Sequence, residues 1–189
     1  MDRRQEILEA ATKSFSLFGF KATTMDQVAK IANVGKGTIY TFFENKEDLF
    51  HEIAFTMIKQ MKAEKDSVIN EQMSFQENAH LVLMKMLEFR ESHVLLSKLI
   101  AEEKEMQTPV VQAVLVKVER EIVHYIAEHI ERAIEKKEIR SVDVQLVAYL
   151  LFKAYMAFAV EWQVTHEEPL PEEKIVAVFR DTIFKSLHV

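Results

Sequence analysis

Glycine and proline are scarce in this chain, and their scarcity constrains the fold more than any other feature of the sequence. The 189 residues contain three glycines and three prolines. β-Sandwiches and barrels need frequent tight turns, which these two residue types supply. The helix-favouring residues Ala, Leu, Glu, Lys and Met are abundant. The sequence therefore predicts an all-α fold.

Helical periodicity and turn residues divide the sequence into about nine helices. We expect helices at 3–18, 24–32, 36–43, 46–68, 74–91, 92–106, 109–137, 143–165 and 171–187. Gly19 is expected to end the first helix, and Thr24 with Gln27 forms a capping box that begins the second. Asn33 is expected to adopt the left-handed conformation that ends it.

Charge is distributed unevenly along the chain. Residues 1–50 contain seven basic and seven acidic residues, whereas residues 51–189 contain seventeen basic and twenty-three acidic ones, which accounts for the net charge of −6. An acidic protein binds nucleic acid poorly outside a dedicated surface. Any DNA-binding surface is therefore expected within the first fifty residues.

The sequence also indicates a compartment. It has no cysteine, which fits a reducing environment, and its first residues lack the apolar segment of a signal peptide. The longest apolar run, Val144 to Val160, is shorter than the ~20 residues of a membrane span and contains Lys153. We expect a cytoplasmic protein without a membrane partner. Lys153 is expected to reach the surface, to pair with a carboxylate such as Glu161 across a dimer, or to meet an acidic ligand.

Two helices of about eight residues joined by a three-residue turn, Asn33 to Gly35, predict a helix-turn-helix. Gly37 would let the second helix approach DNA closely, because it has no side chain. Lys46 begins the next helix and is placed for a phosphate. The side chains expected to project toward a major groove are those of Lys36, Thr38, Tyr40, Thr41 and Phe42.

The stretch "ILEAATKSFSLFGFKATTMDQVAKIANVGKGTIYTFFENKEDLF", within Arg3 to Phe50, resembles the DNA-binding domain of the tetracycline-repressor (TetR) family. It carries the Thr before the second helix, a G-x-[IL]-Y-x-x-F motif and a K-[ED]-x-L motif. The resemblance implies a ligand-responsive repressor that binds a pseudo-palindromic operator as a homodimer. It implies phosphate contacts by Thr24, Tyr40 and Lys46. It implies base-edge contacts by Lys36, Gly37, Thr38, Thr41 and Phe42.

Three positions depart from the family pattern. Asn33 stands where Gly is frequent, Gly35 where Ser is frequent, and Phe42 where His is frequent. Gly caps a helix nearly as well as Ser, so the fold is expected to survive, although a hydroxyl contact to DNA is lost. Phe42 cannot donate a hydrogen bond and would contact a thymine methyl group or a sugar.

The resemblance implies two domains, a helix-turn-helix domain at 1–45 and a larger helical domain at 46–189 that binds an effector and forms the dimer. The effector domain contains apolar, adaptable side chains that would suit a small apolar effector. The predicted ligand-binding residues are Met57, Met61, Met84, Phe89, Leu96, Ile100, Tyr125, Phe152, Tyr155, Met156 and Trp162. The helix at 143–165 has apolar residues on opposite faces, so one face is expected to form a dimer interface together with the last helix.

A helical metalloenzyme is the alternative. Di-iron bundles use two Glu-x-x-His pairs, and this chain has two, Glu77/His80 and Glu121/His124. Chance alone predicts roughly one such pair from this composition. Glu121 and His124 also lie on a polar helix face. We therefore predict a protein that is not an enzyme and that needs no metal or cofactor.

Overall fold

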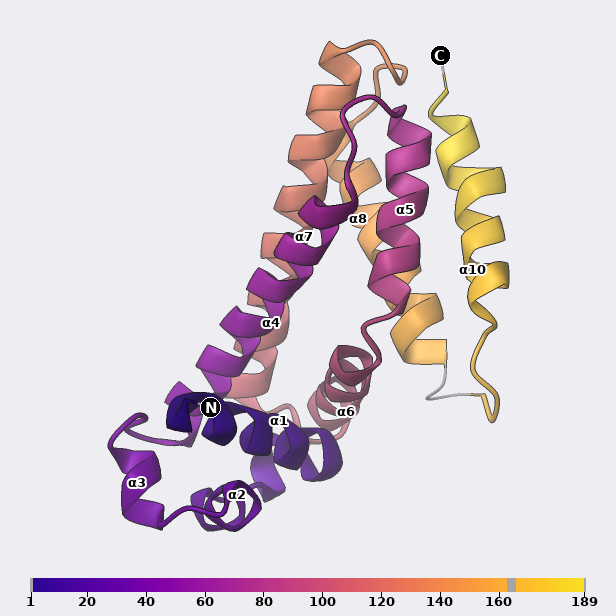
Figure 1. Cartoon of the computed structure of the whole chain (residues 1–189). Coiled ribbons are helices and arrows are strands. Elements are labelled where there is room, and N and C mark those ends of the chain that lie inside the picture. The colour runs from indigo at the N-terminus through magenta and orange to yellow at the C-terminus, as the bar shows by residue number, and fades with distance from the viewer. Residues whose placement is uncertain (1, 163–165, 189) are drawn as a thin grey trace. The chain divides into compact units, whose positions relative to one another are not determined.

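The computed structural model describes residues 2–162 and 166–188, with the backbone alone at 90–92. Every regular element in this part of the chain is helical, as predicted (Figure 1). The helices are α1 (Arg3–Ala22), α2 (Met25–Ala32), α3 (Lys36–Tyr40), α4 (Lys46–Val68), α5 (Phe75–Leu87), α6 (Arg90–Met106), α7 (Pro109–Glu135), α8 (Val144–Tyr155) and α10 (Glu172–Val178). Two π-helical segments, η1 (Met156–Glu161) and η2 (Phe179–Phe184), continue α8 and α10.

The N-terminal helices follow the capping signals of the sequence. The Thr24 hydroxyl accepts from the backbone N–H of Gln27, and the Gln27 side chain accepts from the Thr24 backbone N–H, so the capping box is confirmed. Asn33 has a φ of 53°, which confirms its left-handed conformation. α3 is shorter than predicted, because it ends at Tyr40 and residues 41 and 42 form a turn.

Gly19 has the conformation expected of a helix stop, with a φ of 81°, but the chain resumes a helical turn and α1 continues to Ala22. This kink brings Phe20 into the core, where its ring lies 5.9 Å from that of Phe15 and 4.9 Å from that of Phe50. Phe18 is 47% exposed, because Phe20 occupies the core position next to Phe15.

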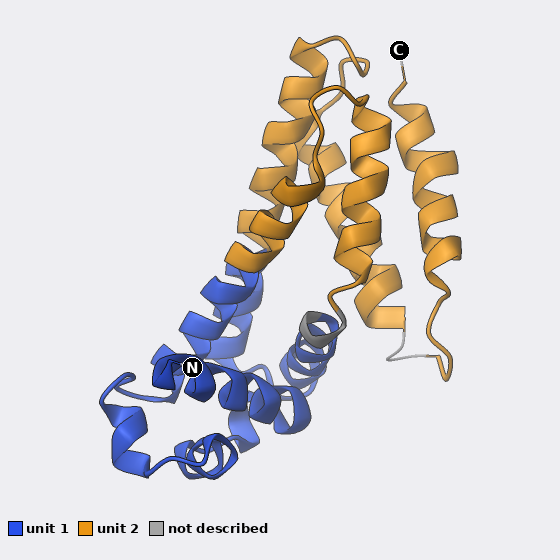
Figure 2. Cartoon of the chain, in the orientation of Figure 1, with its two compact units in different colours: residues 1–58, 91–118 blue, residues 59–90, 119–189 orange. Residues whose placement is uncertain are grey.

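The chain forms two compact units (Figure 2). Unit 1 comprises residues 1–58 and 91–118, and unit 2 comprises residues 59–90 and 119–189. α4 and α7 each begin in unit 1 and end in unit 2. In their contacts within the fold, α6 and the first part of α7 therefore group with the N-terminal helices. The functional division at residue 45 stays a prediction.

In unit 2, α5 packs against α10 and η2. The stretch 144–161 buries one face, which includes Phe152, Met156 and Val160, and leaves Leu146 and Leu150 on the other face exposed. By length and composition alone this stretch is also apolar enough to cross a membrane, and 33% of it is buried in the fold.

Lys153 lies in the middle of that apolar stretch. Its side chain reaches the surface, which is the first of the three possibilities given above for this residue. Its ammonium group forms an ion pair with Glu119 of α7, a partner that the sequence does not indicate. The ammonium also lies 5.2 Å from the ring centroid of Tyr149. The exposed apolar face of α8 therefore contains a charge that is paired with a residue of the same chain.

We expect Gly19→Ala to lower the free energy of unfolding by about 2 kcal/mol or more, since a non-glycine residue at positive φ costs roughly 1–2 kcal/mol before any clash. An added Cβ would also lie 2.3 Å from Oε2 of Glu102. Urea unfolding followed by circular dichroism measures the change. Gly37→Ala is the matched control, because a Cβ there meets no heavy atom within 4 Å. Equal stability of the two variants would contradict this account of Gly19.

Candidate nucleic-acid interface

The turn between α2 and α3 is closed by backbone hydrogen bonds. The N–H of Val34 donates to the carbonyl oxygen of Ala29 at 3.0 Å, and the N–H of Thr38 donates to that of Gly35 at 2.9 Å. Ile39 and Phe43 anchor α3 and the following turn, since both are buried as predicted. With this face anchored, the opposite face of α3 is presented to solvent.

The exposed face of α3 carries most of the predicted DNA-contacting residues. Tyr40 is 46% and Phe42 40% exposed, values that are unusual for large aromatic side chains. Apart from its chain neighbours and its own helix backbone, no heavy atom of the described residues lies within 4 Å of a Cβ added at Gly37. Lys36 and Thr41 are also exposed, whereas Thr38 is half-buried. The structure therefore brings these residues together on one accessible surface, and their contacts with DNA stay a prediction.

Lys36 forms an ion pair with Asp26 of α2, with 2.8 Å between Nζ and Oδ2. The hydrogen bond to this carboxylate raises the pKa of Lys36. Both side chains are more than half exposed, so the pair contributes little to stability. Lys36 can therefore exchange Asp26 for a phosphate or a base edge at small cost.

Lys46, which is predicted to contact a phosphate, also has contacts within the protein. Its ammonium donates to the carbonyl oxygens of Phe20 at 2.8 Å and Thr23 at 3.0 Å, and it lies 4.3 Å from the centroid of the Phe20 ring. Burial lowers its pKa. Two of its three N–H donors are thus used within the protein, which leaves one for the predicted phosphate contact.

Glu102 of α6 contacts the same short turn, and the sequence analysis did not identify it. Its carboxylate is buried and accepts from the backbone N–H groups of Phe20 at 2.6 Å and Lys21 at 3.1 Å, and from the Thr108 hydroxyl at 3.2 Å. The two N–H groups begin the helical turn that follows Gly19, and such groups favour an anion.

Glu102 and Lys46 together hold the turn that precedes α2. The carboxylate binds the N–H groups at its start, and the ammonium binds the carbonyl groups at its end. Thr24, the N-cap of α2, follows directly. The one signal in the sequence for this arrangement is Gly19, which provides the space for the carboxylate. No local pattern identifies a partner 82 residues away.

The predicted ligand-binding residues are divided between the two units, and their role stays a prediction. Met57, Leu96 and Ile100 belong to unit 1, and the remaining eight belong to unit 2. Met84 is 39% exposed. Unit 2 contains a cavity of about 100 Å³, and of the predicted residues Tyr125 alone lines it. Its lining residues are Lys65, Ile69, Asn78, Ala79, Val82, Tyr125, Ile126 and His129.

Three of the four residues of the di-iron alternative, Glu77, Glu121 and His124, have other partners. The Glu77 carboxylate accepts from the backbone N–H of Ser74 at 2.9 Å and thereby caps α5. Glu121 pairs with Lys62 at 3.2 Å, and His124 lies 3.6 Å from Glu128. Among residues 2–162 and 166–188, no group of three or more metal-binding side chains could hold an ion. The alternative therefore has no support.

Sequence comparisons agree with this geometry. Residues 7–53 match the family model described as bacterial regulatory proteins, tetR family. The chain is 47% identical over 187 residues to YhgD of Bacillus subtilis (strain 168), an uncharacterized HTH-type transcriptional regulator, and the match covers 99% of this chain and 97% of YhgD. It is 46% identical over 50 residues to the "Probable acrEF/envCD operon repressor" of Escherichia coli (strain K12), covering 26% of this chain and 23% of that protein.

Solved structures share the fold over nearly the whole chain. Salmonella enterica GusR superposes with a TM-score of 0.79 at 20% identity, covering 98% of this chain and 95% of GusR. The fatty acid degradation regulator FadR from Bacillus halodurans superposes with a TM-score of 0.78 at 17% identity, covering 99% and 95% of the two chains. At this identity the likeness concerns the fold alone.

We expect Glu102→Gln to lower the free energy of unfolding by about 1–3 kcal/mol, because a buried charge-assisted acceptor is lost. The amides of Phe20 and Lys21 should exchange hydrogen faster, and hydrogen exchange measured by NMR tests this directly. Glu105→Gln, on the exposed side of α6, is the matched control. Unchanged protection of both amides in Glu102→Gln would show that the carboxylate does not hold this turn.

Proposed function

Because the chain belongs to the TetR family of bacterial regulatory proteins, we propose that this DNA-binding transcriptional regulator is a homodimeric repressor of a pseudo-palindromic operator, released by a small apolar effector. The observation that carries the proposal is the exposed surface of α3 and the turn after it, on which Lys36 and Tyr40 of α3 and Phe42 of the turn are presented near Gly37. The repressor part is supported by the operon repressor among its relatives.

We place α3 in the major groove, where base edges can be distinguished. Lys36, Gly37, Thr38, Thr41 and Phe42 face the base edges in this arrangement. Thr24, Tyr40 and Lys46 contact phosphates, which position the protein without reading the sequence. Two observations support these assignments. Tyr40 is 46% exposed, and Lys46 has a third N–H group that is not used by the carbonyl oxygens of Phe20 and Thr23.

We propose that the dimer forms through the last two long helices. Leu146, Tyr149 and Leu150 on α8 are 67%, 45% and 53% exposed, and Val178 on α10 is 41% exposed. An apolar patch of this kind marks an interaction surface. A two-fold dimer would place two copies of α3 on half-sites about one helical turn, roughly 34 Å, apart.

Effector binding is proposed for the helical domain after residue 45, and it would act through α4. This helix starts at Lys46, which holds the turn before α2, and it ends at Val68 in unit 2. A shift of α4 would therefore move α3 of one subunit relative to α3 of the other subunit, and the two would no longer match the two half-sites. Since DNA is the target, the protein works in the cytoplasm, and no catalytic activity, membrane or cofactor enters the proposal.

Mobility-shift assays with DNA upstream of the protein's own gene, and selection from random sequences, test operator binding. We expect Tyr40→Ala to weaken binding to all sequences alike, by about tenfold, and Lys36→Ala to relax the preference at one base position. Lys185→Ala, at an exposed site on the last helix, is the control. Absence of binding in both assays would refute the repressor proposal.

We expect the double variant Leu146→Glu with Leu150→Glu to be monomeric, because the charges cannot be buried in an apolar interface. Light scattering at micromolar concentration compares it with a dimeric wild type. Val116→Glu, at an exposed apolar position of α7, should remain dimeric. A monomeric wild type, or a double variant that stays dimeric, would contradict the proposed interface.

A further inference from the structure

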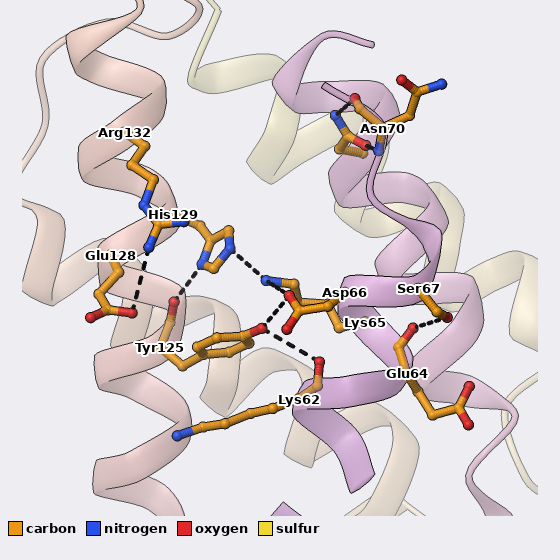
Figure 3. Close-up of polar contacts among 11 residues, drawn as sticks. Lys62, Glu64, Lys65, Asp66, Ser67, Asn70, Tyr125, Glu128, His129 and Arg132 are labelled. Atoms are coloured by element: carbon orange, nitrogen blue, oxygen red, sulfur yellow. Dashed lines mark hydrogen bonds and ion pairs between the residues drawn. The ribbon is translucent and has the colours of Figure 1, made fainter. Parts of the chain in front are cut away.

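A buried lysine, Lys65, lines the cavity in unit 2, and Figure 3 shows the polar contacts around it. Lys65 of α4 is 7% exposed, although burying a lone ammonium group is costly. Tyr125 and His129 of α7 line the same cavity. The Lys65 ammonium lies 4.0 Å from the centroid of the Tyr125 ring and 2.5 Å from Nε2 of His129. The cavity therefore lies next to a positive charge within the fold.

The positive charge of Lys65 is only partly compensated within the protein. Its carboxylate partner is Asp66, at 3.3 Å, whose side chain is 63% exposed. Asp66 also accepts a hydrogen bond of 2.6 Å from the Tyr125 hydroxyl, so it is shared between two donors. Burial lowers the pKa of Lys65 despite this carboxylate. An additional anion would be attracted to the ammonium more strongly in these low-polarity surroundings than in water, and this attraction offsets the cost of removing the anion from water.

His129 supplies an acceptor without charge. Its Nδ1 lies 2.8 Å from the carbonyl oxygen of Tyr125, which can only accept, so Nδ1 carries the proton. Nε2 is then unprotonated and accepts from the Lys65 ammonium. Burial lowers the pKa of His129, which keeps the ring neutral. A carboxylate oxygen could replace Nε2 as the acceptor and would add the missing charge.

The rest of the cavity wall is apolar or already engaged. Ile69, Ala79, Val82 and Ile126 contribute hydrocarbon groups. The amide of Asn78 donates to the carbonyl oxygens of Asn70 and Met73 and accepts from the Asn70 N–H, so it is used by the loop between α4 and α5. A ligand in this cavity would therefore contact the charged Lys65 at one end of the cavity and apolar side chains along the rest of its wall.

We propose that this cavity is the effector site and that it recognises the carboxylate of a monocarboxylic acid with an apolar body. The carboxylate takes the place of Nε2 of His129 against Lys65, and the apolar body packs on Ile69, Val82 and Ile126. The cavity volume of about 100 Å³ corresponds to roughly three water volumes, which suits a small acid or the carboxylate end of a longer one. The proposal rests on the proposed effector regulation and names its ligand class.

The test uses the full chain with hexanoate and benzoate as probes, and the uncharged hexanamide and benzamide as matched controls at equal ionic strength. Calorimetric titration and thermal unfolding measure binding. The acids should bind at least tenfold more tightly than the amides. Lys65→Met should bring the acids to the level of the amides. This variant should fold, because a methionine fills a similar volume and removes a buried charge.

Lys62→Met is the matched variant. Lys62 lies one turn before Lys65 on α4 and pairs with Glu121, outside the cavity lining. It should bind the acids as the wild type does. Equal binding of acids and amides, undiminished acid binding by Lys65→Met, or no binding of either acid would overturn the proposal. Operator binding of the ligand-free protein is measured separately, so a failure of the acid site is distinguishable from a failure of the repressor proposal.

Discussion

The carboxylate of Glu102 makes the interaction on which the DNA-binding surface depends. It holds the N–H groups of Phe20 and Lys21 and thereby fixes the kink at Gly19. The kink places Phe20 against Phe15 and Phe50 in the core of unit 1. Because α2 begins at Met25, three residues after α1 ends at Ala22, the position of the helix-turn-helix follows from this one buried group.

Two buried charges illustrate two solutions to the same physical problem. Of the Lys, Arg, Asp and Glu side chains that the structure describes, Glu102 and Lys65 are buried. Glu102 has three hydrogen-bond donors and the nearby Lys46 ammonium, so its charge is compensated within the protein. Lys65 has one exposed, shared carboxylate and a neutral imidazole. The first arrangement stabilises the fold, and the second leaves affinity for an additional anion.

Local signals in the sequence predicted the elements that are stabilised locally. The capping box of Thr24 and Gln27 and the left-handed Asn33 each depend on residues within four positions of one another. For the same reason the exposed face of α3 follows from the buried Ile39 and Phe43. The partner of Lys153 was not predictable, because Glu119 lies on another helix 34 residues away.

The sequence by itself therefore determined the helical class, the helix boundaries near strong caps and the helix-turn-helix with its family. Only the tertiary structure decided which charges meet. Lys46 donates to the carbonyl groups of Phe20 and Thr23, and a cavity lies beside Lys65 and His129. Periodicity states which face of a helix is apolar, but the partner of a buried charge depends on how separate helices pack. That packing brings together residues whose separation along the chain has no local signature.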